Sequence, residues 1–175
     1  MEKKKLSRKR HDDREDLTGE HAFGDAGQII LFILFFVVWI VDSLIINYSI
    51  ILSDVISLYI RLPISLIILI TSGYLAKAGL NIVFGAVRAK SEVIQSGVFK
   101  IVRHPIYLGA ILFYLAFLVF SFSISAFIVW IITLLFYQFI SKHEEKLLLE
   151  NFGKDYQEYL DTVPMWIPKL NKKQK

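Results

Sequence analysis

Two groups of ionisable and aromatic side chains in this sequence border apolar runs and could form one polar site. Arg103, His104 and Tyr107 lie at the start of one apolar run. The pair Glu144 and Glu145 comes just after the next apolar run ends. If the two runs form a helical hairpin, both groups meet at the same face of a membrane. Ionisable residues gathered at such a boundary favour the presence of a bound polar ligand.

The two groups suit opposite charges on such a ligand. Pro105 favours the first turn of a helix, and a helix N-terminus carries free backbone N–H groups and a partial positive charge. With Arg103 and His104 beside it, this end suits an anion such as a carboxylate. The glutamate pair suits an ammonium group or ribose hydroxyls. Together the groups fit a zwitterionic, amino-acid-like ligand that carries a sugar.

Spacing along the helices refines this arrangement. Adjacent residues on a helix point about 100° apart, so one glutamate can face the ligand while the other pairs with Arg103 or Lys142. Gly109 follows Tyr107 by two residues. The absence of a side chain at Gly109 lets another helix or a flat ligand approach closely.

The elements that must position these residues are membrane helices. Apolar residues make up 55% of the 175-residue chain and fall in long runs with few charges, which predicts membrane spans rather than a globular core. We expect an all-α integral membrane bundle of four transmembrane helices, at residues 28–46, 62–80, 105–120 and 124–140. The last two are so close in sequence that they must form a short antiparallel hairpin. An alternative second helix, 55–76, is disfavoured because it buries the charge of Arg61.

The remaining segments are polar and border the membrane domain. Residues 1–27 are expected to be a cytoplasmic tail, and residues 28–175 a single membrane domain. An apolar stripe along 142–162 predicts an amphipathic cytoplasmic helix, with Gly153 as a break. Lysine and arginine crowd both ends of the chain, which predicts that both termini and the site are cytoplasmic.

Several classes of partner and site are disfavoured. The chain has no cysteine, which excludes disulfides, thiolate metal sites and a cysteine nucleophile. Acidic residues are mixed into the basic N-terminus, so we expect a membrane surface rather than nucleic acid as the partner. His104, His143 and Glu144 follow no recognised ligand spacing, and we expect no metal. Asp42, inside the first span, is either a functional residue or the partner of Arg61.

Two coupled sets of residues resemble the family of membrane methyltransferases typified by isoprenylcysteine carboxyl methyltransferase. The first is the segment from Ser96 to Gly109, with its Arg-His-Pro-Ile-Tyr sequence at 103–107. The second set is Glu144-Glu145, Phe152-Gly153, Tyr156, Tyr159 and Val163-Pro164. Their order and spacing resemble the family over roughly residues 80–168.

This resemblance implies S-adenosylmethionine as the methyl donor, bound between the hairpin and the C-terminal segment. His104 and Tyr107, with the backbone around them, would hold its methionine part, and Glu144 and Glu145 its other polar groups. The cofactor-binding residues implied are His104, Pro105, Tyr107, Gly109, Glu144 and Glu145, and those implied in catalysis are Arg103 and Glu144.

The resemblance also implies a lipophilic acceptor that enters from the membrane. An isoprenylcysteine-type carboxylate, a lipid amine and a small thiol all stay open as acceptors. Methyl transfer is an in-line displacement at an activated sulfonium methyl group, so the protein's task is positioning and desolvation. A carboxylate or thiolate acceptor needs no general base, whereas an amine acceptor must lose a proton, which Glu144, Glu145 or His104 could accept.

The alternative is a non-enzymatic membrane scaffold or a transporter-like protein. Such a protein would place polar residues deep in several spans, and only Asp42 does so. Taken without the rest of the pattern, Arg103 and His104 would be charges at a membrane face. Tyr156 and Tyr159 are expected to be interfacial anchors.

Overall fold

The computed structural model describes residues 22–50, 55–85 and 92–168. Within these residues the chain is helical and contains no strand. The elements are α1 (Ala22–Ile40), a π-helical turn (Val41–Ile46), α2 (Leu58–Phe84), a 3₁₀ turn (Gly97–Lys100), α3 (Pro105–Ser121), α4 (Ile124–Phe152) and α5 (Lys154–Thr162). Most of the predicted N-terminal tail lies outside the described residues.

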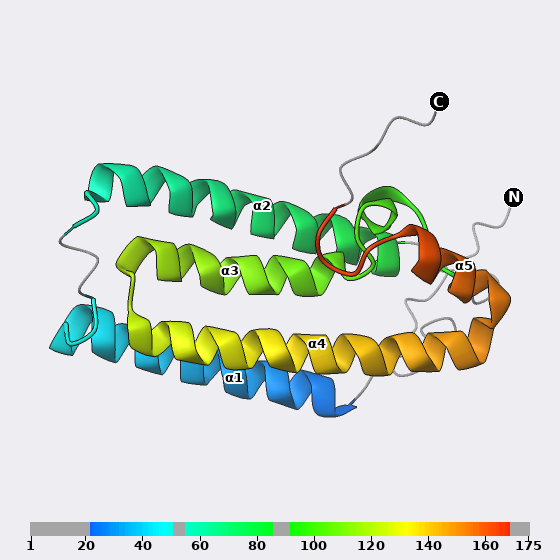
Figure 1. Ribbon diagram of the computed structural model, residues 1–175, viewed down its shortest axis with the longest axis horizontal. Helices are drawn as coiled ribbons and strands as arrows, with labels where there is room; N and C mark the ends of the chain where they lie inside the picture. Colours follow the sequence, from blue (N-terminus) through cyan, green and yellow to red (C-terminus); the bar gives the residue numbers. More distant parts are fainter. Residues whose placement is uncertain (1–21, 51–54, 86–91, 169–175) are drawn as a thin grey trace, which may run out of the picture.

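The four long helices form a bundle whose members run along a common direction (Figure 1). Helix α2 packs along α3, and α4 packs along α1. The turn between α3 and α4 lies at one end of the bundle, and α5 and the 3₁₀ turn lie at the other (Figure 1). The predicted antiparallel hairpin is therefore confirmed, and the start of α3 lies at the same end as the later part of α4.

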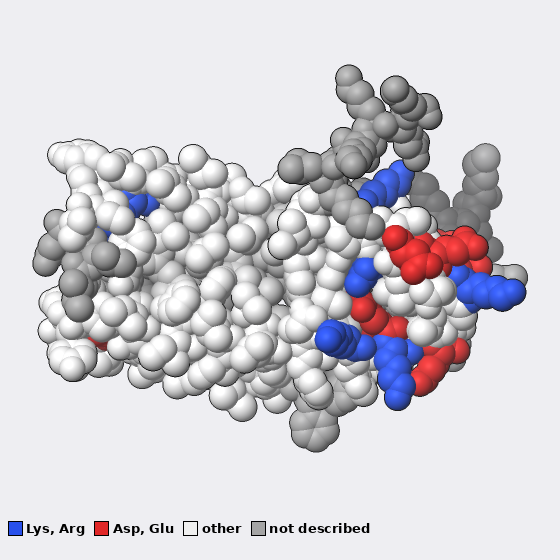
Figure 2. Space-filling model, in the orientation of Figure 1, with Lys and Arg blue, Asp and Glu red and all other residues white. Residues whose placement is uncertain are grey.

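Among the residues that the structure describes, three helices are long and apolar enough to cross a membrane, namely Gly24–Ile46, Leu58–Phe84 and Ile124–Phe152. Helix α3 is apolar but has only 17 residues, which gives a length of about 25 Å against a hydrocarbon core of about 30 Å. Large apolar side chains on the long helices face outward, as lipid contact requires. The charged side chains on the face shown in Figure 2 gather mainly at the α5 end.

The boundaries of α2 and α4 differ from the predicted ones. Helix α2 starts at Leu58, where the Ser57 hydroxyl accepts a hydrogen bond from the Tyr59 N–H, so Arg61 lies inside the helix. Helix α4 continues past residue 140 to Phe152, because the charged residues after the apolar run are mostly good helix formers. The glutamate pair therefore lies within α4 and not after it. Gly153, with φ +55°, ends the helix as predicted.

Asp42 does not pair with Arg61. Its carboxylate accepts a 3.0 Å hydrogen bond from the Ser49 N–H and further hydrogen bonds from the hydroxyls of Ser49 and Ser123. Arg61 instead donates to the Phe120 carbonyl at 2.9 Å. Of the two alternatives left open for Asp42, the pairing with Arg61 is therefore wrong, and Asp42 joins the segment after α1 to the turn between α3 and α4.

Small residues bring α2 and α3 into close contact. A Cβ atom at Gly109 would lie 3.0 Å from the Ser72 carbonyl oxygen and 3.1 Å from the Ala76 nitrogen. The Ser72 hydroxyl also donates to the Gly109 carbonyl at 2.8 Å. Such contacts need a residue without a side chain at the crossing point. Of the two approaches expected at Gly109, the structure shows that of a helix.

We predict that Gly109→Leu will lower the free energy of unfolding by about 1–3 kcal/mol, because the new side chain overpacks the interface between α2 and α3. Gly73→Leu is the matched control, since a Cβ atom there has nothing within 4 Å. It should leave the free energy of unfolding unchanged or raise it. Denaturation of the purified protein in detergent measures both. Equal stability of the two variants would contradict the close contact.

Candidate active site

The start of α3 brings Arg103 and His104 to the polar end of the bundle. Pro105 occupies the first turn of α3, as predicted, and His104 directly precedes the helix. The Arg103 N–H donates to the Pro164 carbonyl at 3.0 Å, which fixes the chain where it enters the helix. His104 and Pro105 are both buried, so the imidazole is held inside the protein and is not a solvated charge at a membrane face.

Glu145 binds both basic residues through one oxygen atom. Its Oε1 lies 2.7 Å from Arg103 Nε and 3.0 Å from His104 Nε2. The side chains of Arg103 and Glu145 are only 12% and 13% exposed, so water screens this contact far less than it would screen a surface ion pair. The contact joins α4 to the start of α3.

Glu144 faces a different set of groups. The Tyr107 hydroxyl donates to Glu144 Oε1, and Glu144 Oε2 lies 3.7 Å from His104 Nδ1. The rings of His104 and Tyr107 are nearly parallel, with centroids 5.8 Å apart. The two glutamates thus divide their contacts as their positions on the helix predict, with Glu145 as the partner of Arg103.

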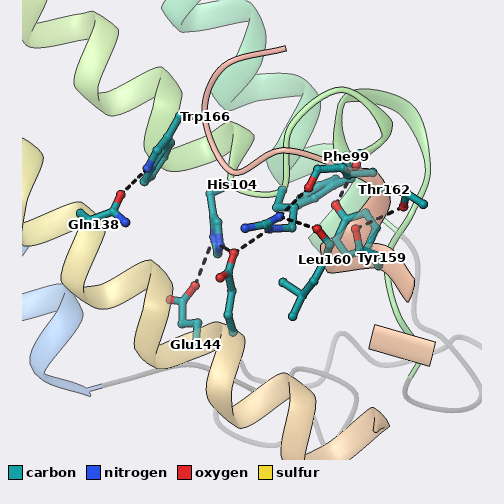
Figure 3. A network of polar contacts seen from close by, with 11 residues as sticks. Phe99, His104, Gln138, Glu144, Tyr159, Leu160, Thr162 and Trp166 are labelled. Atoms are coloured by element: carbon teal, nitrogen blue, oxygen red, sulfur yellow. Dashed lines mark hydrogen bonds and ion pairs between the residues drawn. The ribbon is translucent and has the colours of Figure 1, made fainter. Parts of the chain in front are cut away.

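Arg103 also holds the C-terminal segment after α5. Its Nη1 donates to the Leu160 carbonyl at 3.0 Å and to the Val163 carbonyl. Trp166 lies further along this segment, with its ring centroid 5.7 Å from that of His104. The Trp166 indole N–H donates to the Gln138 side chain at 2.6 Å (Figure 3). Neither Gln138 nor Trp166 was among the predicted site residues.

A cavity of about 220 Å³ lies among these elements. Apolar side chains from α2, α3, α4 and the segment before α3 form part of its wall. Its polar and tyrosine lining consists of Glu92, Arg103, His104, Tyr107, Glu144, Tyr156 and Tyr159. The cavity can therefore receive a ligand that is partly flat and apolar and partly charged.

The predicted site residues fall into two places. Pro105 lines the cavity together with His104, Tyr107 and Glu144. Glu145 lies behind this wall as the partner of Arg103 and His104, and Gly109 lies at the contact with α2. The structure brings the two predicted groups together at one end of the bundle.

Two tyrosines of α5 also belong to this end of the molecule. Tyr156 and Tyr159 are 3% and 4% exposed, and burial raises the pKa of each phenol. The Tyr159 hydroxyl donates to the Phe99 carbonyl at 2.7 Å, which holds α5 against the 3₁₀ turn. Both hydroxyls therefore keep their protons at neutral pH.

Comparison with known proteins identifies the family. A family model described as phospholipid methyltransferase matches residues 57–155, more than half of the 175-residue chain. The chain belongs to the phospholipid methyltransferase family. This confirms the resemblance to membrane methyltransferases that the sequence showed, and membership implies methyltransferase activity at a membrane. No curated protein matches the chain at a significant level.

The segment that the phospholipid methyltransferase model matches contains all of α2, α3 and α4. It therefore includes both groups of polar residues and most of the cavity wall. Tyr156, Tyr159 and Trp166 lie beyond its end, and α1 lies before its start. The family match therefore does not cover these residues, and their contacts are known from the structure of this chain.

We predict that Arg103→Lys will release the C-terminal segment. Lysine keeps the charge beside Glu145, but it lacks the planar fork that also reaches the two carbonyls. Hydrogen exchange at residues 160–166 should become at least about tenfold faster, as expected for the loss of hydrogen bonds to a charged group. Mass spectrometry of the exchanged peptides measures this.

Lys146→Ala is the control for that experiment. It breaks only an exposed pair with Glu150, which contributes little, so exchange at 160–166 should not change. If Arg103→Lys also left the exchange unchanged, the segment would be held by Trp166 and not by Arg103.

Proposed function

We propose that this protein transfers the methyl group of S-adenosylmethionine to a lipophilic acceptor resident in the membrane. One observation carries the proposal. In a member of this family, the cluster of Arg103, His104 and the two glutamates borders a cavity at the end of an apolar helical bundle. A polar donor could reach this end from water, and an apolar acceptor could reach it from the bilayer.

The residues around the cavity fit the donor's chemistry. S-adenosylmethionine supplies an activated sulfonium methyl group, and it also carries an ammonium group, a carboxylate and ribose hydroxyls. Glu144 suits the ammonium group or the ribose hydroxyls, while His104 and the start of α3 suit the carboxylate. Glu145 keeps the imidazole in place through the 3.0 Å contact with Nε2. On this proposal Pro105 and Tyr107 complete the wall, and Gly109 positions α3 against α2.

Arg103 and Glu144 are the residues proposed to act on the acceptor. Arginine has five N–H donors, and the Arg103 side-chain bonds to other described residues use only Nε and Nη1. The Nη2 group therefore stays available for an anionic acceptor such as an isoprenylcysteine-type carboxylate. With an amine acceptor, Glu144 would instead accept the proton that the amine loses.

We predict that the purified protein will bind S-adenosylhomocysteine and that His104→Ala and Glu144→Gln will weaken binding about tenfold or more. Each variant removes a charged or hydrogen-bonding group from the cavity wall, worth about 1.5–3 kcal/mol. Lys146→Gln, on the exposed side of α4, is the matched control and should bind normally. Titration calorimetry in detergent measures the affinities.

Absence of binding by a well-folded parent would favour the scaffold alternative. Where binding is found, labelled S-adenosylmethionine can be offered with a prenylated cysteine or with an aminolipid. Transfer to the carboxylate that is lost in Arg103→Lys, while transfer to the amine and binding of S-adenosylhomocysteine are kept, supports the role of Nη2. Transfer to the amine that is lost in Glu144→Gln even at saturating S-adenosylmethionine supports proton acceptance by Glu144.

The proposal includes an orientation in the membrane. All four long helices cross the bilayer, and the site and both termini face the cytoplasm, as the lysine and arginine residues at the two chain ends favour. The hydrophobic length of α3 is short, and local thinning of the bilayer accommodates it.

We predict opposite accessibility for two introduced cysteines, since the natural chain has none. Lys146→Cys, at the site end, should react with a membrane-impermeant maleimide only after the cytoplasmic side is opened. Tyr48→Cys, at the other end of α1 and 82% exposed as tyrosine, should react in intact cells. The reverse pattern would invert the proposed orientation.

A further inference from the structure

We propose that Arg61 binds the phosphate group of a membrane phospholipid at the end of the bundle opposite the cavity. The inference goes beyond the proposed function, because it concerns a second site and holds whether or not the protein transfers methyl groups. Arg61 lies one turn into α2. It is the only lysine or arginine between residues 15 and 76, and Figure 2 shows a small positively charged area at this end.

The guanidinium group of Arg61 is held in place but incompletely bonded. Its Nη1 donates to the Phe120 carbonyl at 2.9 Å, at the C-terminal end of α3. Arginine has five N–H donors, and the side chain makes no other hydrogen bond to a described residue. Its Nε is enclosed by the protein without a partner among these residues. An incompletely bonded charge is unfavourable at such a place, so a nearby anion would stabilise it.

The acidic residue described at this end does not supply that anion. The Asp42 carboxylate is bonded by Ser49 and Ser123. No ion pair joins Arg61 to a carboxylate of the described part of the chain. The sequence has one further acidic residue between residues 26 and 91, Asp54, which lies outside the described residues. The anion for Arg61 is therefore sought outside the protein.

The depth of Arg61 favours a lipid headgroup. Helix α3 is about 25 Å long and the hydrocarbon core about 30 Å thick, so one end of α3 lies beneath the surface of an undisturbed bilayer. Arg61 is bonded to that end at Phe120. Tyr48 and Tyr59, at the same end of the bundle, are 82% and 91% exposed, as expected of side chains at a membrane interface. Arg61 thus lies where it can draw a headgroup inward, toward the short helix.

A phospholipid supplies both contacts that this position offers. The oxygen atoms of its phosphate group accept the paired hydrogen bonds that a guanidinium group donates. Its acyl chains can lie along exposed apolar side chains of α2 such as Leu62 and Leu66. A free phosphate ion would lose its hydration at this depth without gaining the apolar contact. A bound headgroup here also gives a physical cause for the thinning of the bilayer beside α3.

The test measures binding of phosphatidylglycerol, which has no amine to methylate, to the delipidated protein in detergent. Native mass spectrometry gives the affinity of the tightest bound lipid for the parent and for Arg61→Gln. Glutamine can still donate to the Phe120 carbonyl but carries no charge, so the affinity should fall about tenfold or more. Lys77→Gln is the matched control, because Lys77 is an exposed cation further along the same helix. It should bind this lipid as the parent does.

Two competitors separate the phosphate group from the acyl chains and from a free anion. Neither diacylglycerol with the same chains nor inorganic phosphate, each at the concentration of the lipid, should displace the bound phosphatidylglycerol. Displacement by diacylglycerol would indicate a groove for acyl chains only, and displacement by inorganic phosphate would indicate a site for free anions. Either result would overturn the inference, as would equal affinity of the parent and Arg61→Gln.

Melting temperatures without lipid test whether Asp54 is the partner of Arg61. Arg61→Gln removes an incompletely bonded charge, so it should melt no lower than the parent in lipid-free detergent. A lower melting temperature in both Arg61→Gln and Asp54→Asn would show an ion pair between the two residues and overturn the inference. If Arg61→Gln did not fold, Arg61→Lys would serve instead. It keeps the charge but loses the planar fork, and its affinity for phosphatidylglycerol should fall about threefold or more.

This site and the cavity can fail independently. Because they lie at opposite ends of the bundle (Figure 1), Arg61→Gln should bind S-adenosylhomocysteine as the parent does. Absence of S-adenosylhomocysteine binding by the parent would contradict the proposed function and leave the lipid site standing. Loss of S-adenosylhomocysteine binding in Arg61→Gln would show a general structural change and overturn the inference.

Discussion

The bond between Glu145 and the two basic residues before α3 determines how this end of the protein is built. One carboxylate oxygen lies within 3.0 Å of both Arg103 and His104, and all three side chains are largely buried. Burying charges near an apolar bundle is unfavourable unless they are paired and hydrogen-bonded. The contact therefore requires α4, the start of α3 and the C-terminal segment to be in place together.

The consequences reach beyond the three residues. Because Glu145 occupies Arg103 and His104 Nε2, the neighbouring Glu144 is turned toward Tyr107 and the cavity. Because Arg103 Nη1 reaches the carbonyls at the end of α5, the chain passes close to His104 and carries Trp166 there. One ionic contact thus separates a supporting glutamate from a glutamate that faces the ligand, and it closes one side of the cavity.

Much of this arrangement could be predicted from the sequence, for reasons that can be named. The hairpin followed from two apolar runs with a very short link, and the meeting of its polar ends followed from the antiparallel geometry. The division of contacts between the glutamates followed from the helical repeat. The length of α4 was wrong because an apolar window ends where charges begin, whereas the helix continues through Lys142 and Glu150. The hydrogen bonds of Arg103 to the carbonyls of Leu160 and Val163 could not be predicted, because every residue has a backbone carbonyl and residue types do not indicate which one is bonded.

The two polar clusters of the bundle show why its chemistry belongs at one end only. At the turn between α3 and α4, the Asp42 carboxylate is satisfied by Ser49 and Ser123, and these bonds join segments of the protein to one another. None of these three residues belongs to the described lining of the cavity at the other end. At the opposite end, Glu144 and Tyr156 line the cavity. A pathway across the membrane would need polar groups between the two clusters. The buried core there is instead mostly apolar and aromatic, with Phe35 and Trp39 against Ile111 and Leu118. The fold therefore separates a polar contact that secures the bundle from a polar site that borders a cavity, and this second site is where the proposed methyl transfer would take place.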